Sequence, residues 1–249
     1  MRRQLIALGM LCGLLPGFVV HTHAAEAPAV SAASAVLMDA ETGRVLYAHN
    51  EQEPRAIAST TKLMTALVAA EYLGGDLSET VEIKREWTGI EGTSLYLKPG
   101  ETITLKTLLY GLLLHSGNDA AVALAGICGG EVETFVGWMN QRAQELGMAD
   151  TTFLNCTGLP AQGHQTSAHD IALMSRELIL NHPSIREYTT IWMDSIRNGA
   201  FGLTNTNRLI RFYQGATGLK TGSTDSALYC MSATAERDGM ELIAVVLKS

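Results

Sequence analysis

Three short motifs occur once each, and in a fixed order, along this 249-residue chain. An S-x-x-K motif begins at Ser59, an S-G-N motif begins at Ser116 and a K-T-G motif begins at Lys220. Serine, lysine and asparagine in this order are the parts of an activated serine nucleophile, its base and a substrate clamp. A fold that uses all three must bring distant segments of the chain to one place, which constrains it more than any other feature.

The first motif lies at the start of a predicted helix. Residues 60–73 lack proline and glycine, are rich in Leu, Met and Ala, and are followed by two glycines, which is typical of a helix and its C-terminal cap. Ser59 would then lie at the helix N-terminus, with Lys62 on the same face. The Lys62 amine can accept the serine proton only if burial or a second cation, for which Lys220 is the candidate, lowers its pKa. Alone, the motif would be a helix cap followed by a solvated lysine.

The second motif falls between two further predicted helices, at 105–114 and 119–128. In such a joint the Ser116 hydroxyl can relay a proton, and the Asn118 amide can hold a substrate carbonyl. An S-G-N between helices is, by itself, more often ordinary turn chemistry. Its functional interpretation therefore depends on the other two motifs.

The third motif lies just before two predicted strands, at 227–234 and 240–247, and is expected to lead into this strand pair. An extended peptide could pair with the edge of such a strand, with the Lys220 and Thr221 side chains facing its carboxylate. Gly222 leaves room for a close backbone approach. The simpler alternative is a lysine that protects an exposed strand edge.

Strands are expected at both ends of the chain, with helices between them. Apolar runs at 35–38 and 44–48 surround a glycine-containing turn and predict a hairpin. Helices are also expected at 133–146 and 167–180. The sequence therefore predicts an α/β (α+β) fold, in which N- and C-terminal strands form one antiparallel sheet and an all-helical region is inserted at about 63–195.

Residues 1–25 have the pattern of a secretory signal peptide: two arginines, an apolar run over 5–20, and alanines at 24 and 25. An uncleaved anchor is the alternative, but the run is shorter than the ~20 apolar residues of a spanning helix. We therefore expect export to the cell envelope or beyond, with no sequence evidence for membrane attachment. Residues 26–249 are expected to form a single catalytic domain, because no Pro- or Ser-rich linker divides them after about residue 33.

Composition excludes some classes of partner. The formal net charge is −7, with 25 acidic and 18 basic residues and no basic cluster, so nucleic acid is not an expected partner. Removal of the signal leaves Cys128, Cys156 and Cys230, an odd number that predicts free thiols and no disulfide framework. The sequence indicates no metal and no cofactor.

The three motifs resemble those of the low-molecular-mass penicillin-binding proteins that act as serine-type D-Ala-D-Ala carboxypeptidases. The likeness extends over about residues 35–247 and includes further stretches at 97–101, 139–140, 146–148, 153–155 and 166–170. The resemblance implies the transpeptidase-like fold of penicillin-binding proteins and serine β-lactamases. Glycine in the middle of the second motif favours carboxypeptidases, because class A β-lactamases carry aspartate there.

The resemblance also implies a mechanism. Ser59 would attack the carbonyl between the two terminal D-alanines of a peptidoglycan stem peptide, D-alanine would leave, and water would hydrolyse the acyl-enzyme. Lys62 would be the base, Lys220, Thr221, Gly222 and Ser223 would bind the substrate, and the main-chain N–H groups of Ser59 and Ser223 would form the oxyanion hole. β-Lactam antibiotics would trap Ser59. The choice between water as the acceptor of the acyl group, as in a carboxypeptidase, and an amine, as in a transpeptidase, also rests on the resemblance.

Two alternatives remain open at this point. Residues 177–181 match the E-x-x-L-N pattern of the class A β-lactamase deacylating glutamate, but Glu177 lies 61 residues after Ser116 and only 43 before Lys220. That glutamate sits nearer the second motif in class A enzymes, so we interpret the match as a coincidence. A catalytically silent cell-wall-binding or sensor module is the other alternative, and the intact Ser59, Lys62 and Lys220 argue against it.

The C-terminus is a further expectation from the resemblance. The chain stops at Ser249, shortly after a predicted strand. The family usually continues through an arginine-bearing stretch and a helix that covers the sheet, so we expect the C-terminal end to be truncated.

Overall fold

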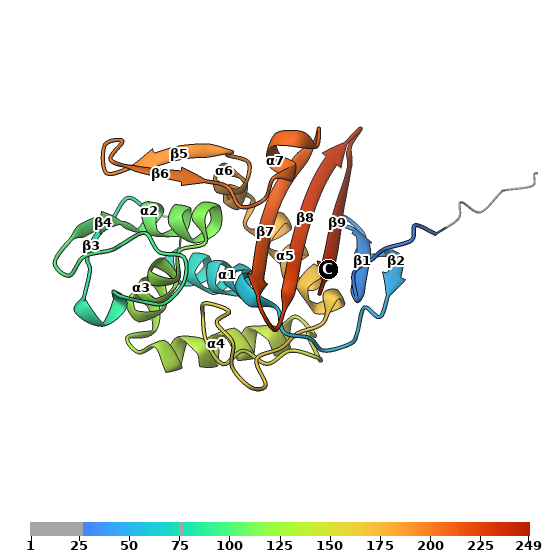
Figure 1. The fold of residues 1–249 in the computed structure, drawn as a ribbon, viewed down its shortest axis with the longest axis horizontal. Helices are drawn as coiled ribbons and strands as arrows, with labels where there is room; N and C mark the ends of the chain where they lie inside the picture. The colour runs from blue at the N-terminus through green and yellow to red at the C-terminus, as the bar shows by residue number, and fades with distance from the viewer. Residues whose placement is uncertain (1–26, 75–76) are drawn as a thin grey trace, which may run out of the picture.

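The computed structural model describes residues 27–74 and 77–249, and the predicted signal peptide at 1–25 lies outside them. Five antiparallel strands form the main sheet in the order β2-β1-β9-β8-β7 (Figure 1). Their bounds are β1 Ser34–Asp39, β2 Val45–His49, β7 Ala216–Thr224, β8 Leu228–Arg237 and β9 Met240–Leu247. The predicted sheet from both ends of the chain is confirmed.

Local chemistry explains the hairpin that opens the chain. The Asp39 carboxylate accepts hydrogen bonds from the Thr42 N–H at 2.8 Å and the Thr42 hydroxyl at 2.6 Å. Gly43 follows with φ +72°, a conformation that glycine adopts without steric cost. The turn reverses the chain, so that β2 pairs antiparallel with β1. The other edge of β1 pairs antiparallel with β9, where Leu37 lies opposite Ala244.

A predominantly helical region lies between β2 and β7, next to the β7 edge of the sheet (Figure 1). Its longer helices are α1 Lys62–Leu73, α2 Leu105–Tyr110, α3 Asn118–Gly129, α4 Val132–Glu145 and α5 Ala168–Asn181. Shorter turns are η1 Ala58–Thr61, η2 Arg85–Trp87, the π-helical η3 Gly111–His115, η4 Pro183–Ile185, α6 Arg186–Thr189 and α7 Leu209–Phe212. All five predicted helices are present; four have ends within two residues of their expected positions, whereas the helix predicted at 105–114 is α-helical only to Tyr110 and continues as the π-helical η3.

Two features differ from the sequence-based expectation. The inserted region also holds two small antiparallel sheets, β3 Thr80–Glu82 with β4 Thr102–Thr104, and β5 Met193–Ile196 with β6 Phe201–Thr204. Strands of three or four residues are too short to show a clear alternation. The K-T-G motif lies inside β7 and does not begin it: Ala216–Leu219 precede it in the strand. These four residues were not predicted as strand, because they include a glycine, which weakens a strand pattern.

Helix α1 forms the centre of the molecule. Its residues from Lys62 to Ala69 are all buried, and Leu63, Met64 and Leu67 have no exposed surface. A helix that is apolar on all sides belongs in a core, and α1 packs against α3, α4 and α5. Ser59 and Lys62 therefore lie at the N-terminal end of a rigid element.

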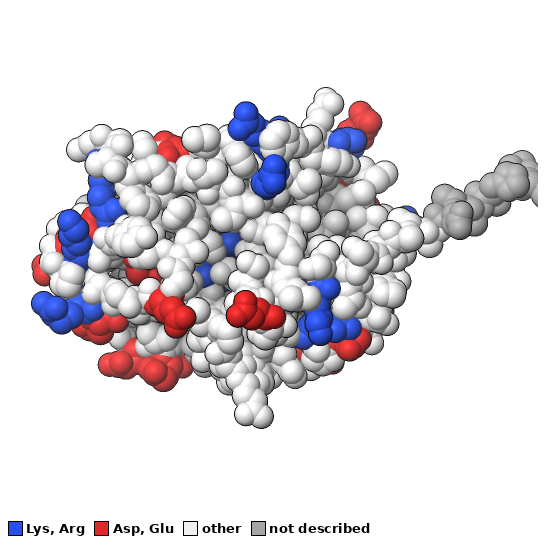
Figure 2. All heavy atoms as spheres, in the orientation of Figure 1, with Lys and Arg blue, Asp and Glu red and all other residues white. Residues whose placement is uncertain are grey.

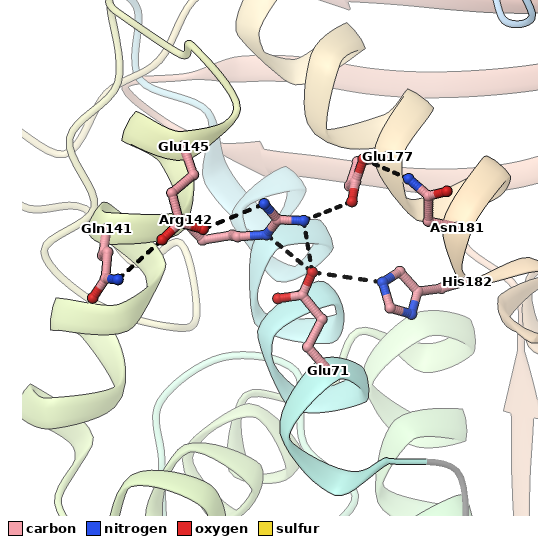
Figure 3. Close-up of polar contacts among 7 residues, drawn as sticks. All are labelled: Glu71, Gln141, Arg142, Glu145, Glu177, Asn181 and His182. Carbon is pink, nitrogen blue, oxygen red and sulfur yellow. Dashed lines mark hydrogen bonds and ion pairs between the residues drawn. The ribbon is translucent and has the colours of Figure 1, made fainter.

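An ion-pair cluster fastens the other end of α1 (Figure 3). Arg142 on α4 donates to Glu71 on α1 at 2.9 Å and to Glu177 on α5 at 2.6 Å. His182 Nε2 lies 3.6 Å from Glu71, so Glu71, Glu177 and His182 place three potential ligand atoms within 4.8 Å of one another. Arg142 already supplies the positive charge that a cation would bring, and the cluster ties three helices together.

Two further expectations concern thiols and membrane spans. Cys128, Cys156 and Cys230 are buried and free, as predicted. Within the described ranges, no single helix is long and apolar enough to cross a membrane. The bent pair Asn118–Gly129 and Val132–Glu145 passes that length and composition test only when its two helices are taken together.

Candidate active site

The first two motifs meet at the amine of Lys62. Lys62 Nζ lies 2.9 Å from Ser59 Oγ and 2.6 Å from Asn118 Oδ1. A third contact of 2.6 Å joins Nζ to the main-chain carbonyl of Thr157. The amine is thereby fixed against the serine hydroxyl by groups from three separate segments.

Burial sets the proton affinity of this amine. Lys62 has no exposed surface, and burial lowers its pKa to about 7, with the neighbouring Cys156 and Asp119 opposing the shift. Near neutral pH a large fraction of Lys62 is therefore uncharged and able to accept a proton. Desolvation, and not the proposed second cation, is the leading cause at Lys62.

Lys220 is the second buried lysine of the site. It lies on β7 with no exposed surface, and its Nζ donates to the Thr221 carbonyl at 2.9 Å. Burial lowers the pKa of Lys220 well below its usual range, and the charge of Lys62 lowers it further. The two lysines are thus close enough to sense each other's charge.

The S-G-N motif adopts an unusual backbone at the junction of η3 and α3. Ser116 has φ +70° and is buried, and the Gly117 N–H donates to the Gly111 carbonyl at 3.1 Å. Asn118 follows as the first residue of α3, and its Nδ2 donates to the Glu91 carbonyl at 2.5 Å. Asn118 therefore contacts Lys62 with its oxygen and a neighbouring loop with its nitrogen.

Asp119 shapes that loop, which covers residues 91–97. Its carboxylate accepts from the Ser94 hydroxyl at 2.6 Å, and from the N–H groups of Leu95 and Leu97 at 2.9 and 3.0 Å. These contacts give Asp119 a structural role in the loop. The loop is one wall beside the S-G-N motif.

The K-T-G strand packs directly on the S-x-x-K turn. A Cβ at Gly222 would lie 2.6 Å from the Ser59 nitrogen and 3.0 Å from the Thr60 nitrogen, so only glycine fits there. Ser223, the next residue, is exposed, and Thr221 is buried. Ala58, just before the nucleophile, has φ +48°, a strained conformation of the kind that concentrates at functional sites.

The segment that supplies the third contact to Lys62 was not predicted from the sequence. The Asn155 side chain accepts from the N–H groups of Thr157 and Gly158 at 3.1 and 2.7 Å, which fixes this loop. His164, which is buried, joins the loop to the first motif: Nδ1 accepts from the Leu154 N–H at 3.0 Å, and Nε2 lies 2.8 Å from Thr61 Oγ1. A main-chain carbonyl has no signature in the sequence, although 153–155 was among the stretches that suggested the family.

Glu177 takes no part in this network. Its two oxygens accept from Arg142 and from Asn181, at 2.6 and 2.8 Å (Figure 3). It belongs to the cluster around Glu71, which lies nine residues after Lys62 on α1, or about 13 Å along the helix axis. The E-x-x-L-N match therefore stands at the opposite end of α1 from Ser59.

The site geometry can be compared with known proteins. A sequence model of the family described as D-alanyl-D-alanine carboxypeptidase matches residues 21–249. The chain belongs to this D-alanyl-D-alanine carboxypeptidase family. The D-alanyl-D-alanine carboxypeptidase DacF of Bacillus subtilis is 44% identical over 221 residues, which cover 86% of this chain and 57% of that protein. The chain thus spans less than two thirds of the length of this relative.

Solved structures of the family share the fold. Penicillin-binding protein D2 of Listeria monocytogenes, in its cefotaxime-bound form, is 35% identical with a TM-score of 0.81, covering 90% of this chain and 92% of that one. A mutant of the DD-transpeptidase of Streptomyces K15 is 30% identical with a TM-score of 0.84, covering 89% and 92%. The predicted transpeptidase-like fold of penicillin-binding proteins is confirmed.

Proposed function

We propose that this chain is a serine-type D-Ala-D-Ala carboxypeptidase that removes the terminal D-alanine from peptidoglycan stem peptides. The observation that carries the proposal is the buried Lys62 amine, 2.9 Å from Ser59 Oγ, with a pKa lowered to about 7. A serine beside an amine that is partly neutral at physiological pH is an activated nucleophile. Membership of the D-alanyl-D-alanine carboxypeptidase family supports this choice of substrate class.

The first half of the reaction is acylation. Ser59 Oγ attacks the carbonyl carbon between the two D-alanines, and its proton passes to Lys62 Nζ. The oxyanion that forms accepts hydrogen bonds from the N–H groups of Ser59 and Ser223. The close approach of Gly222 to the Ser59 nitrogen supports this arrangement, because it packs the strand that carries Ser223 against the nucleophile turn.

Collapse of the tetrahedral intermediate completes acylation, and hydrolysis of the acyl-enzyme is the second half of the reaction. The C–N bond breaks, and the leaving D-alanine nitrogen takes a proton that the Ser116 hydroxyl relays from Lys62. Water then attacks the Ser59 ester and gives a proton to Lys62 Nζ; the ester C–O bond breaks, the shortened peptide leaves, and Lys62 returns a proton to Ser59 Oγ. Asn118 positions the peptide backbone, while Lys220 and Thr221 face the terminal carboxylate of the substrate.

We further propose that β-lactam antibiotics inhibit the protein by acylating Ser59. The relative from Listeria monocytogenes has been solved in cefotaxime-bound and ampicillin-bound forms. We also propose export across the cytoplasmic membrane, to the cell envelope where peptidoglycan lies, on the basis of the signal pattern at 1–25. Residues 26–249 would then act as one catalytic domain.

Release of D-alanine tests the activity. We expect the protein to liberate D-alanine from diacetyl-L-lysyl-D-Ala-D-Ala, and the Ser59→Ala variant to liberate none. The Gly137→Ala variant, on an open part of α4, is the matched control and should keep full activity. Added glycine or D-amino acid that appears in the peptide product would shift the proposal to transpeptidation. No release by a folded protein would point to a silent binding module.

A further inference from the structure

Arg197 occupies an unusual position in the turn between β5 and β6. It follows the last residue of β5 with φ +53°, in the left-handed region that residues other than glycine seldom adopt. Such conformations concentrate at functional sites, where the surrounding structure maintains them. The Arg197 side chain is only 28% exposed, because it leaves its own hairpin and reaches the segment 91–101. No step of the proposed reaction uses this side chain.

The Arg197 guanidinium binds two parts of the segment 91–101 at once. Nη1 donates to the Leu95 carbonyl at 2.9 Å, while Nε and Nη2 donate to the two carboxylate oxygens of Glu101 at 2.6 and 3.0 Å. Figure 2 shows charged side chains of both signs intermixed at the end of the molecule where Figure 1 places β3, β4 and the β5–β6 turn. The planar, bidentate fork, which a lysine cannot reproduce, therefore distinguishes Arg197 more than its charge does.

Leu95 is held from both sides by these contacts. Its N–H donates to Asp119 Oδ1 at 2.9 Å, and its carbonyl accepts from Arg197. The Leu95 side chain has no exposed surface and fills the space beside two glycines. A Cβ at Gly111 would lie 2.2 Å from Leu95 Cδ1, and a Cβ at Gly117 would lie 3.1 Å from Leu95 Cγ. Because Gly117 is the middle residue of the S-G-N motif, Leu95 packs directly against the motif's backbone.

The same segment orients the Asn118 amide. The Asn118 N–H donates to the Thr93 carbonyl at 2.7 Å, and Nδ2 donates to the Glu91 carbonyl at 2.5 Å. A Cβ at Gly92 would lie 2.8 Å from Nδ2, so the segment backbone lies close against the amide. With Nδ2 turned to the segment, Oδ1 faces Lys62 Nζ at 2.6 Å. The segment therefore determines which end of the amide faces the catalytic amine.

The β5–β6 hairpin is itself anchored beside the S-G-N motif. Phe201 begins β6, and its ring packs edge-on against His115, the residue before the motif, with ring centroids 5.6 Å apart. After β6, the Thr206 N–H donates to the Leu114 carbonyl at 3.3 Å. The hairpin thus supports the segment 91–101 from a base that is fixed to the same motif.

We propose that Arg197 is a positioning residue of the active site, which holds the segment 91–101 against the S-G-N motif through Leu95 and so keeps the Asn118 amide on Lys62. The inference rests on the proposed function, in which Lys62 is the base. Without the fork, the segment loses its polar support on the hairpin side. The motif then spends part of its time in arrangements that cannot react.

The loss should fall on kcat more than on KM. A displacement of about 1 Å in a catalytic group can slow a reaction by ~10²-fold. The Ser116 hydroxyl and the Lys62 amine act in the chemical steps, and both depend on the position of the motif. The groups on β7 that face the substrate carboxylate, Lys220 and Thr221, make no contact with Arg197 among the described residues, so substrate binding should change little.

Arg197→Gly tests this role, because glycine accepts φ +53° without strain while the side chain is removed. Asn198→Gly, at φ +54° in the same turn, is the matched control, since the Asn198 side chain forms no hydrogen bond to the segment within the described ranges. For diacetyl-L-lysyl-D-Ala-D-Ala, we expect kcat of Arg197→Gly to fall ~10–100-fold below that of the control, with KM within about threefold. Melting temperatures should agree within about 3 °C. Arg197→Lys, which keeps the charge but not the fork, should recover only part of the loss.

The outcomes separate this role from the activity itself. A kcat of Arg197→Gly equal to that of Asn198→Gly would overturn the positioning role and leave the carboxypeptidase proposal intact. A loss confined to KM, or one accompanied by a fall in melting temperature of more than about 5 °C, would also overturn it, the latter in favour of a merely structural role. No D-alanine release by the unaltered protein would overturn the carboxypeptidase proposal, and the rate of Ser59 acylation by a penicillin would then decide the role of Arg197 by the same comparison.

Discussion

Lys62 carries its amine at the start of a helix whose first two turns are wholly buried. At the scale of the residue, this burial decides the chemistry, because removal from water disfavours the charged form of the amine. Three acceptors surround Nζ, and one of them is the serine that must lose a proton. The contacts that fix the amine therefore also hold it next to the Ser59 hydroxyl, whose proton it accepts.

The pH dependence of acylation follows from this lysine. Only neutral Lys62 accepts the Ser59 proton, so the second-order rate of acylation by a penicillin should rise with pH and level off above an apparent pKa near 7. The measurement is a stopped-flow or quench series between pH 5 and 9. Lys62→Arg, which stays protonated throughout, should be slower by ~10²–10⁴-fold. A flat profile, or a midpoint near the ordinary lysine value, would contradict this role.

Gly222 gives a second prediction at this scale. Gly222→Ala places a methyl group 2.6 Å from the Ser59 nitrogen, and relief requires β7 or the nucleophile turn to move. We expect ~1–3 kcal/mol of lost stability, together with loss of penicillin acylation. Gly137→Ala, in open space on α4, should be neutral or stabilise by up to ~1 kcal/mol. Thermal unfolding and acylation rates of both variants would show the difference, and full acylation by Gly222→Ala would refute the close packing.

At the scale of the element, His164 fastens the loop 155–165 to Thr61 at the end of η1, the turn that leads into α1. Burial lowers the pKa of His164 to about 4, so the neutral ring accepts from Leu154 and contacts Thr61 at ordinary pH. Because the unfolded chain binds this proton at higher pH, the stabilisation is complete above about pH 6.5 and is lost as pH falls through about 4. The loop also carries the Thr157 carbonyl that contacts Lys62.

His164 variants test this connection. His164→Ala leaves the partners on both sides unpaired and should cost ~2–4 kcal/mol, whereas His164→Gln, which can keep one hydrogen bond, should cost less. Urea denaturation at pH 7 and at pH 4.5 measures both effects. The difference in stability between the protein and His164→Gln should shrink at the lower pH. An equal difference at the two pH values would show that His164 does not titrate as described.

Glu177 provides a test of the β-lactamase alternative at the scale of the helix. Glu177 lies in the Arg142 cluster at the far end of α1 from Ser59. Glu177→Gln should therefore leave the lifetime of the penicillin adduct within about twofold, while weakening partly exposed ion pairs by ~0.2–1 kcal/mol. Adduct decay followed by mass spectrometry is the measurement. A much longer lifetime in the variant would mean that Glu177 activates the deacylating water.

Sequence reasoning reached the helices and the main strands because their patterns are long. The helices beginning at Lys62 and Asn118 carry glycines at their ends and apolar interiors, which are local signals. It missed the short β5 and β6 strands, and it missed the Thr157 carbonyl, which is brought to Lys62 from 95 residues away. Such a contact depends on tertiary packing, and a main-chain oxygen looks the same in every residue.

At the scale of the whole molecule, the sheet explains how distant motifs become neighbours. Pairing of β1 with β9 joins the two ends of the described chain, and β7 forms the edge that faces α1 (Figure 1). The helical region then delivers the S-G-N motif from the other side, through the contact between Asn118 and Lys62. The main sheet and the buried helix α1 thus bring the three motifs together in space, although they lie far apart along the chain.

The most direct measurement of the central claim is intact-mass spectrometry of the protein during incubation with a penicillin, with Ser59→Ala as the control. We expect a single long-lived adduct of the mass of the antibiotic, absent from Ser59→Ala and released slowly by water. An unmodified protein with the antibiotic destroyed would contradict the carboxypeptidase proposal in favour of a β-lactamase. An unmodified protein with intact antibiotic would contradict an active Ser59 altogether.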